Sequence, residues 1–498
     1  MDGHADYVVV GAGSAGSVVA RRLVDAGASV LLLEAGGPAV NPAIDDPARM
    51  HELWHAAEDW DYFTVPQRYA RGRRLHLPRG RVVGGSHALN ATIYVRGNPA
   101  DYDHWAALGN PGWAWRDVRP LFERIERGPL PVHTGFEPDP VQSAILEAAQ
   151  QCGIPLNENY NSGVQDGVST LAFTLDGGRR VTTASAYLAP VLGHPEFTLL
   201  AGAQVRRLLV EGDRARGVEF VRAGRVARAT AGAEVVVCAG ALGSPLLLQR
   251  SGIGPAEWLR LAGVEVLADL PGVGRNLQDH WLVPVIFSAE REITHRPGLP
   301  HCQTQFFARS RPGLPVPDLQ PLHFSVPLYE SWMSGPPNGF SLMAGLIRPE
   351  SAGEVRISGP EPGDQPRIDP SVLSAAADLT ALRTAVELCR EIGRAPALRD
   401  WAAAERYPGP ADLEEYVRRT VLTYHHQAGT CRMGAVVDAE LRVHGIAGLR
   451  IADASIMPTV TTGNTNAPAI VIAEKAAELL GGGKVATMRQ DDVVQEVP

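Results

Sequence analysis

The chain has 498 residues, which is more than one ordinary hydrophobic core holds, so its length predicts two domains. Hydrophobic residues make up 45% of the sequence and charged residues 20%, a balance that excludes a mainly disordered chain. The formal net charge of -9 and the isoelectric point near 5.9 argue against a nucleic-acid or anionic-membrane partner, since either would need a basic surface.

The first residues have the pattern of a strand, a glycine turn, a helix and a second strand. Residues 7–10 are continuously apolar, as expected of a parallel strand that is covered on both faces. Residues 14–26 carry small and apolar side chains at helical spacing, and Gly27 follows as a stop. Residues 30–33 predict the second strand, which ends at Glu34.

Loops rich in Gly, Pro, Trp and Arg are predicted from residue 36 to about 98. A helix is predicted over 140–152, with Asp139 as a suitable N-cap and Pro140 at the first helical position. Short β-like runs follow at residues 205–210, 218–221 and 234–238.

The second half of the chain begins with a segment that has little periodicity. Residues 290–349 are dense in Pro, Ser and aromatic side chains, and we interpret them as the wall of a substrate site. Amphipathic helices are predicted over 378–394 and 468–480, and the tail after Gly483 is polar. The sequence contains no internal repeat.

A glycine motif lies between the first strand and the first helix. In the run GAGSAG, Gly11 permits a tight turn, Gly13 lets the backbone approach a pyrophosphate, and Gly16 lets helix and strand pack closely. The N-terminus of the following helix offers free N–H groups and a partial positive charge to phosphates. Glu34 ends the second strand, where an acid accepts hydrogen bonds from an adenosine ribose. This combination predicts dinucleotide binding without choosing between NAD and FAD.

Five scattered cysteines and the absence of CxxC and HExxH patterns predict reduced thiols, with neither a disulfide framework nor a metal site. The residues after Met1 lack the basic start of a secretory signal. No apolar run approaches the roughly 18 residues of a membrane span. We therefore expect a cytoplasmic protein without a transmembrane segment, and the sequence leaves its oligomeric state open.

Several longer blocks resemble those of the glucose-methanol-choline (GMC) oxidoreductases. Residues 80–90, GRVVGGSHALN, are similar to the first signature of that family, and residues 240–254 match the second at every constrained position. Further blocks in family order are residues 274–280, 426–434, 453–458 and 463–468. Within the family, the chain is most similar to bacterial choline dehydrogenases and pyridoxine oxidases, and to hydroxymethylfurfural or aryl-alcohol oxidases; a mycofactocin-associated dehydrogenase is an alternative.

The resemblance implies an α/β fold, α+β overall, in which a Rossmann-like FAD-binding domain is interleaved with a mainly antiparallel substrate domain that also contains helices. We place the FAD-binding domain at 1–155, 200–290 and 420–498, and the substrate-binding domain at 156–199 and 291–419. The implied cofactor is FAD. The residues expected to bind it are Gly11, Gly13, Ser14, Ala15, Gly16, Glu34, Ala35, Arg81, Gly84, Ser86, Asn90, Ala91, Val205, Ala239, Gly240, Asp453, Ala454, Asn466 and Ala467.

Oxidising an alcohol with a flavin requires a base for the hydroxyl proton and a polar partner for the developing alkoxide. The family pattern places the base at His426, and the spacing His-x-x-Gly-Thr favours this residue over its neighbour His425. The second catalytic position is Asn464, whose amide can donate a hydrogen bond but cannot act as a base at neutral pH. Asn464, Thr465 and Asn466 also supply capping residues for the last predicted helix, whose N-terminal dipole would stabilise an anionic reduced flavin.

Two positions depart from the family pattern. Leu89 occupies the place where some members link FAD covalently through a histidine, so noncovalent FAD is expected. His87 stands where serine is common, and the sequence offers no physical reason for the change. Other histidines, including His87 and His280, are expected to be structural or loop residues.

The leading hypothesis is oxidation of a primary alcohol to an aldehyde, with oxygen or another acceptor regenerating the flavin. One alternative is a lyase or photodecarboxylase on the same fold, without net alcohol oxidation. A flavin-binding protein without catalysis is a third possibility, which the retention of both His426 and Asn464 argues against. The sequence names neither the alcohol nor the acceptor.

Overall fold

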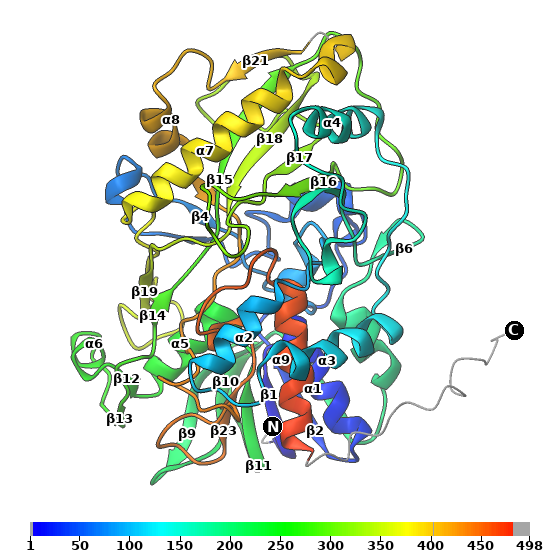
Figure 1. The fold of residues 1–498 in the computed structure, drawn as a ribbon. Helices are drawn as coiled ribbons and strands as arrows, with labels where there is room; N and C mark the ends of the chain where they lie inside the picture. The colour runs from blue at the N-terminus through cyan, green and yellow to red at the C-terminus, as the bar shows by residue number, and fades with distance from the viewer. Residues whose placement is uncertain (1–2, 402, 482–498) are drawn as a thin grey trace, which may run out of the picture.

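The computed structural model describes residues 3–401 and 403–481, and it places two large sheets one above the other (Figure 1). The lower sheet in this view has the strand order β8-β2-β1-β11-β10-β9, and β23 pairs with β11. Its strands are β1 (Gly3–Val10), β2 (Val30–Glu34), β8 (Phe197–Ala201), β9 (Ala203–Glu211), β10 (Arg214–Arg222), β11 (Arg225–Val237) and β23 (Leu449–Ile451).

Parallel and antiparallel pairings meet in this sheet at β11. Its first half pairs antiparallel with β10, and its second half runs parallel to β1 and β23. The parallel pairs β1·β2 and β2·β8 complete the nucleotide-binding pattern. The predicted strand at 7–10 and those at 30–33, 205–210, 218–221 and 234–238 all lie in this sheet, apart from the terminal Cys238.

Helix α1 (Ser14–Asp25) and helix α9 (Asn466–Leu480) pack against each other beside this sheet, drawn in blue and red in Figure 1. Gly13 is the N-cap of α1, so no side chain caps this helix, and Gly27 follows its end as predicted. Helix α9 starts two residues before the predicted position, and Thr465 is its N-cap, although the Thr465 side chain makes no capping hydrogen bond. The predicted polar tail after Gly483 lies outside the described residues.

The upper sheet is antiparallel, with the order β21-β15-β18-β17-β16-β5 and with β22 paired to β15. Its strands are β5 (Gly167–Thr170), β15 (Trp281–Ser288), β16 (Cys302–Phe307), β17 (Leu322–Phe324), β18 (Gly339–Leu346), β21 (Ala404–Tyr407) and β22 (Leu422–Thr423). Every residue of β15, β16, β17 and β18 is buried, because helices cover one face and the rest of the molecule covers the other. Residues 290–349 thus contain three buried strands of this sheet.

Helices α7 (Ala376–Gly393) and α4 (Pro140–Gln151) pack on the upper sheet (Figure 1). Both were predicted within two residues. Pro140 holds the first position of α4 as expected, but Asp139 does not cap it with its side chain. Its carboxylate instead accepts the backbone N–H of Arg296 at 2.8 Å and contacts Nδ1 of His295 at 3.2 Å.

Smaller elements complete the fold. The remaining helices are α2 (Pro99–Ala107), α3 (Trp115–Arg127), α5 (Gly240–Arg250), α6 (Ala256–Leu261) and α8 (Leu413–Thr420). The minor strands are β3 (Tyr62–Phe63), β4 (His76–Leu77), β6 (Leu175–Asp176), β7 (Arg179–Arg180), β12 (Ile253–Gly254), β13 (Ala268–Asp269), β14 (Arg275–Leu277), β19 (Gly353–Arg356) and β20 (Arg367–Asp369). Residues 36–98 hold only 3₁₀ turns and two-residue strands, so the predicted loops are confirmed.

The chain passes between the two sheets several times. Strand β8 begins at Phe197, inside the segment 156–199 that we assigned to the substrate domain, and α4 packs on the upper sheet although it belongs to the segment 1–155. The division into domains at those residue numbers stays a prediction. No helix in the described ranges combines the length and the apolar character needed to cross a membrane.

Candidate active site

One large cavity extends from the start of α1 to the histidine pair at 425 and 426, between the two sheets. It opens where β1 and β2 end, the edge at which parallel sheets bind ligands. Both histidines and Asn464 line it. The expected cofactor-binding residues on its wall are Gly11, Gly13, Ser14, Ala15, Glu34, Ala35, Ser86, Asn90, Ala91, Val205, Ala239, Gly240, Asp453, Ala454 and Asn466.

Four expected cofactor-binding residues do not line the cavity. A Cβ at Gly16 would stand 1.8 Å from the carbonyl oxygen of Gly11, so this glycine allows the close helix–strand contact. Gly84 has φ of 103° and donates its N–H to the carbonyl of Ala12. The Arg81 guanidinium stacks on the Trp60 ring, and Ala467 is buried in α9. Their positions suit support of the wall, not direct contact with a ligand.

Two helix N-termini meet at the cavity. The hydroxyl of Ser14, the first residue of α1, donates a hydrogen bond to Oδ1 of Asn466, the first residue of α9, at 2.6 Å. Beside them, a Cβ on Gly85 would stand only 2.7 Å from Cα of Gly13, so the two glycine loops touch through their backbones. Free N–H groups and positive helix ends around a groove without bulky side chains fit the pyrophosphate of a dinucleotide.

Glu34 lies at the end of the cavity that the glycine motif forms, here called the nucleotide end. Its carboxylate accepts the backbone N–H of Ala12 at 2.9 Å and that of Gly36 at 2.8 Å. Burial raises the pKa of Glu34 to about 7, against the lowering effect of these backbone bonds and of Arg81. The carboxylate therefore fixes the turn of the glycine motif as well as facing the cavity.

The two predicted catalytic residues are in contact. The side-chain nitrogen Nδ2 of Asn464 lies 3.2 Å from Nε2 of His426, and both side chains face the cavity. Burial lowers the pKa of His426 well below its usual value, and His280, His425 and Arg79 lower it further. The imidazole of His426 is therefore neutral near pH 7, with one nitrogen able to accept a proton.

His280, which the sequence analysis treated as structural, lies directly behind His426. Its Nδ1 is 2.9 Å from Nδ1 of His426, and the backbone N–H of His426 donates to Oδ1 of Asp279 at 2.8 Å. Since the Asn464 amide donates to Nε2 of His426, the proton of the neutral ring is assigned to Nδ1, where it points at His280. The block at residues 274–280 was recognised in the sequence, but nothing in it showed that His280 meets His426.

Gln320 fixes which way the Asn464 amide faces. Its Nε2 donates to Oδ1 of Asn464 at 3.0 Å and to Oε1 of Gln305 at 2.6 Å. The Asn464 oxygen is thereby occupied and its amide N–H points at His426. No sequence signal marked Gln320, because it comes from the segment 290–349 that carries no motif.

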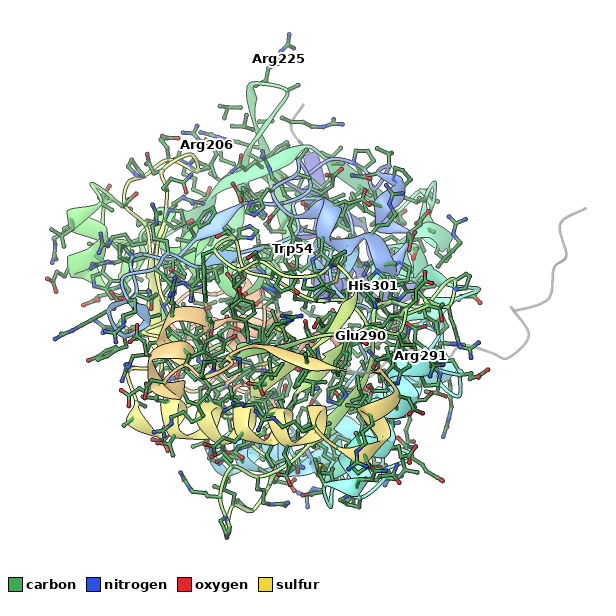
Figure 2. All side chains as sticks on the ribbon, turned by 90° about the horizontal axis from the view of Figure 1, so that it is seen from above. Trp54, Arg206, Arg225, Glu290, Arg291 and His301 are labelled. Atoms are coloured by element: carbon green, nitrogen blue, oxygen red, sulfur yellow. The ribbon has the colours of Figure 1, made fainter. Side chains whose placement is uncertain are left out.

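His425 occupies a different environment from its neighbour. It has φ of 68°, a left-handed conformation that is unusual for a residue with a side chain, and Arg79 donates to its carbonyl at 2.7 Å. Burial, with Arg79, lowers the pKa of His425 to about 3. Its Nδ1 has no hydrogen-bond partner in the described part of the chain, and its ring packs against Trp54. Figure 2 labels Trp54 near the centre of the face seen from above.

The structure shows what the His87 side chain contacts. Its Nδ1 accepts the backbone N–H of Thr183 at 3.2 Å, and its Nε2 contacts the Thr174 hydroxyl at 3.0 Å. The ring is fully buried and lies off the cavity, whereas Leu89 lines it. His87 thus ties the glycine loop to the segment after β7.

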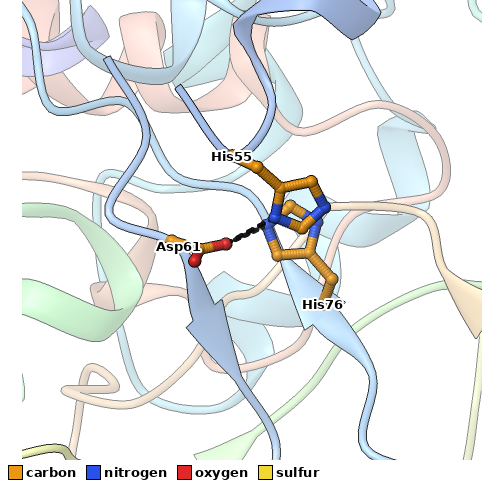
Figure 3. A group of neighbouring side chains, drawn as sticks. All are labelled: His55, Asp61 and His76. Atoms are coloured by element: carbon orange, nitrogen blue, oxygen red, sulfur yellow. Dashed lines mark hydrogen bonds and ion pairs between the residues drawn. The ribbon is translucent and has the colours of Figure 1, made fainter. Parts of the chain in front are cut away.

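A second histidine cluster lies beside the cavity wall (Figure 3). Nδ1 of His55 is 2.6 Å and Nε2 of His76 is 3.2 Å from Oδ1 of Asp61, and these ligand atoms lie within 4.8 Å of one another. Two imidazoles and a carboxylate form a donor set that divalent transition metals accept. Nε2 of His76 also contacts the buried Asp59 at 3.0 Å, so the group has protein partners of its own. These three residues follow neither the CxxC nor the HExxH pattern, so the sequence predicted no metal site here.

Comparison with known proteins gives matches over nearly the whole chain. An oxygen-dependent choline dehydrogenase from Brucella anthropi is 37% identical over 537 residues, covering 98% of both proteins. The structure of pyridoxine 4-oxidase from "Mesorbium loti" superimposes with a TM-score of 0.91 at 39% identity, covering 95% of this chain and 98% of that one. A formate oxidase variant from Aspergillus oryzae RIB40, described for its FAD modification, has a TM-score of 0.89 at 25% identity, covering 97% and 99%.

Two family models, both described as GMC oxidoreductase, match residues 5–282 and 349–473. Together with the relatives above, they confirm the resemblance, the mixed α/β fold and the FAD cofactor that the sequence implied. The chain belongs to the GMC oxidoreductase family and is an FAD-dependent enzyme that acts on alcohols.

Proposed function

We propose that this enzyme oxidises a primary alcohol to an aldehyde, with His426 as the base and Asn464 as the partner of the developing alkoxide. The observation that carries the proposal is the 3.2 Å contact between the two side chains on the cavity wall. FAD, when bound, supplies the flavin N5 that accepts the hydride. Oxygen or another acceptor then reoxidises the cofactor.

The protonation state of His426 supports this role. With its own proton on Nδ1 and directed at His280, the ring presents a lone pair at Nε2 toward the cavity. An alcohol hydroxyl that displaces the direct Asn464–His426 hydrogen bond can give its proton to Nε2 and accept a hydrogen bond from the Asn464 amide. Asn464 cannot take the proton itself, so the pair contains a single base.

Neighbouring groups hold this pair in one orientation. Asp279 anchors the backbone of His426, His280 holds its far ring nitrogen, and Gln320 holds the Asn464 oxygen. Apolar side chains such as Leu322 and Met343 border the same space and exclude water from it. The reacting groups are therefore positioned before substrate arrives, which lowers the entropic part of the barrier.

At the other end of the cavity, we propose that the glycine motif and the starts of α1 and α9 hold the FAD pyrophosphate. Glu34 would accept hydrogen bonds from the adenosine ribose with the lone pairs that Ala12 and Gly36 leave free. The N-terminus of α9, near Asn464, would stabilise negative charge on the reduced flavin.

Anaerobic addition of alcohols to the purified, FAD-replete enzyme tests the proposal. An alcohol substrate should bleach the flavin absorbance and yield one aldehyde per flavin. A lyase or photodecarboxylase on the same fold would convert its substrate while the flavin stays oxidised. Parallel assays with oxygen and with an artificial dye acceptor then identify the class of oxidant.

A further inference from the structure

The part of the cavity around His426, here called the substrate end, is lined mainly by uncharged side chains. Its walls come from the upper sheet and from the 3₁₀ turn before Trp54. Besides His425, His426 and Asn464, the lining includes Arg79, Gln427, Met50, His51, Trp54, Leu282, Leu322, Phe324, Leu328, Met343, Leu422 and Tyr424.

No carboxylate lines the substrate end among the residues that the structure describes. The acids on the cavity wall are Glu34 and Asp453, and both belong to the nucleotide end. Glu34 accepts backbone N–H groups of the glycine motif. Asp453 accepts the Gly240 N–H at 2.9 Å and the Ser244 hydroxyl at 2.5 Å. Neither acid is available to a substrate beside His426.

The charged side chain that lines the cavity beside the histidine pair is a cation, whereas Asp279, which holds the His426 backbone, does not line it. Arg79 lines the cavity, and one of its N–H groups donates to the His425 carbonyl at 2.7 Å. Within residues 3–401 and 403–481, Arg79 forms no ion pair at 4 Å or less. Asp279 and Asp59 act on Arg79 through space but do not line the cavity, so a second positive charge placed beside the guanidinium would be repelled.

The aromatic rings do not replace the missing carboxylate. Quaternary ammonium groups can be held by the open faces of several aromatic rings. Here the Tyr424 ring stacks on His426 at 4.6 Å, and its hydroxyl donates to the Gln320 carbonyl. Trp54 packs edge-to-face against both His51 and His425. These contacts already occupy ring surface that a cation would need.

We infer that the substrate end takes an uncharged alcohol with an apolar aliphatic or aromatic body, and that it discriminates against quaternary ammonium alcohols such as choline. This inference rests on the proposed alcohol oxidation at the same site. It separates this chain from the specificity named for its choline dehydrogenase relatives, which are 37% identical. The physical reason is that a buried cation without a counter-charge is strongly destabilised.

Choline and 3,3-dimethylbutan-1-ol provide a matched pair, because they have the same shape and differ only by nitrogen or carbon at one centre. A second pair is 4-(trimethylammonio)benzyl alcohol and 4-tert-butylbenzyl alcohol. Anaerobic stopped-flow reduction of the holoenzyme should favour the neutral member of at least one pair by about 100-fold or more in the ratio of the reduction rate constant to Kd. Equal or better reduction by the cationic members would overturn the inference.

Binding, measured through the perturbation of the flavin spectrum, tests the charge preference separately from the proposed oxidation. If the neutral members bind more tightly but no alcohol bleaches the flavin, the proposed oxidation fails and the charge preference stands. If the cationic members bind as tightly as the neutral ones, the charge preference fails whatever the turnover.

A carboxylate introduced at the substrate end supplies a further test. Met343 on β18 is opposite Leu322 on β17 and is 3% exposed. Met343→Glu should raise the choline to dimethylbutanol ratio by about 10-fold or more over Met343→Gln, which has the same shape without the charge. Assays up to about pH 9 allow for the raised pKa of a buried carboxyl. If both variants, with matched FAD content, show the same ratio, the missing carboxylate does not set the specificity.

Discussion

The adjacent residues His425 and His426 differ in what their ring nitrogens contact. His426 bonds His280 on one side and Asn464 on the other, whereas Nδ1 of His425 has no partner in the described part of the chain. We therefore expect His426→Ala to slow flavin reduction by about 10²–10⁴-fold, the usual contribution of a general base, and His425→Ala to slow it far less. Stopped-flow reduction of FAD-replete variants measures both.

The pH dependence provides an independent check on the same pair. A base must be neutral, and burial with the nearby histidines and Arg79 lowers the pKa of His426 well below 6.5. The acid limb of kcat/KM in the wild-type enzyme should therefore lie below the pH range of an exposed histidine. The limb should disappear in His426→Ala and persist in His425→Ala. The reverse pattern would assign the base to His425.

Leu89 predicts how the cofactor is held. Leucine cannot form the covalent bond that a histidine makes at this position in some relatives, and His87 is buried away from the cavity between Thr174 and Thr183. Acid precipitation of the holoenzyme should leave a yellow supernatant and a colourless pellet. Flavin retained in the washed pellet would show a covalent link.

At the residue scale, the sequence predicted His426 and Asn464 as a catalytic pair but did not mark the groups that orient them. His426 and Asn464 stand in blocks with fixed spacing, so their contact was predictable. His280 and Gln320 act through hydrogen bonds that connect segments more than 140 residues apart. A single sequence records no such contact, and a buried glutamine in an apolar strand region has no local pattern that distinguishes its role.

At the element scale, prediction succeeded where a regular apolar pattern is bounded by clear stop signals. The amphipathic period placed α7 and α9 within two residues, and continuous apolar runs placed β1 and β2. Strands β16, β17 and β18 were missed, because all their residues are buried and prolines and glycines separate them. Asp139 fits the pattern of an N-cap, but a distant backbone N–H competes successfully for its carboxylate.

The packing of α1 against α9 depends on a buried ion pair. Arg22, 5% exposed, donates to Glu474, 0% exposed, at 2.8 Å, and the Tyr187 hydroxyl also donates to Glu474. Glu474→Ala leaves the buried guanidinium only the longer contact with Asp25 at 3.6 Å, which should lower the free energy of unfolding by up to about 3–5 kcal/mol. Chemical denaturation of the holoenzyme measures this loss.

Glu123→Ala is the matched control for that variant. It removes two surface ion pairs on α3, with Arg119 at 2.8 Å and with Arg127 at 3.7 Å, each one helical turn away, and the arginine side chains are 60% and 82% exposed. Such surface pairs contribute about 0.3–0.5 kcal/mol, so this variant should unfold close to the wild type. Similar losses in the two variants would mean that the buried pair adds nothing beyond a surface pair.

At the scale of the whole molecule, the cavity depends on both sheets. Its nucleotide end is built from β1, β2 and α1, and its substrate end from β15, β17 and β18. The chain alternates between these parts, so the relative placement of the sheets follows from long-range packing. It could be predicted from the sequence only through the family resemblance. A ligand that spans the cavity contacts both parts and should stabilise them together.

Removal of FAD should therefore lower the midpoint of thermal unfolding for the whole chain. A ligand present at about 1,000 times its Kd adds about 4 kcal/mol to the free energy of unfolding. Because the unfolding entropy is near 2 cal/mol/K per residue, this gain corresponds to a rise of roughly 4 °C in the midpoint for a chain of this length.

FMN lacks the adenosine and one phosphate of FAD. It therefore cannot occupy the glycine motif and Glu34, and it should restore only part of the shift in the midpoint. Scanning fluorimetry of the apoprotein with FAD, FMN or neither measures the three midpoints. Equal midpoints with FAD and FMN would mean that the adenosine end of the cavity adds nothing to stability, and a separate early transition in the apoprotein would mean that the two parts unfold independently.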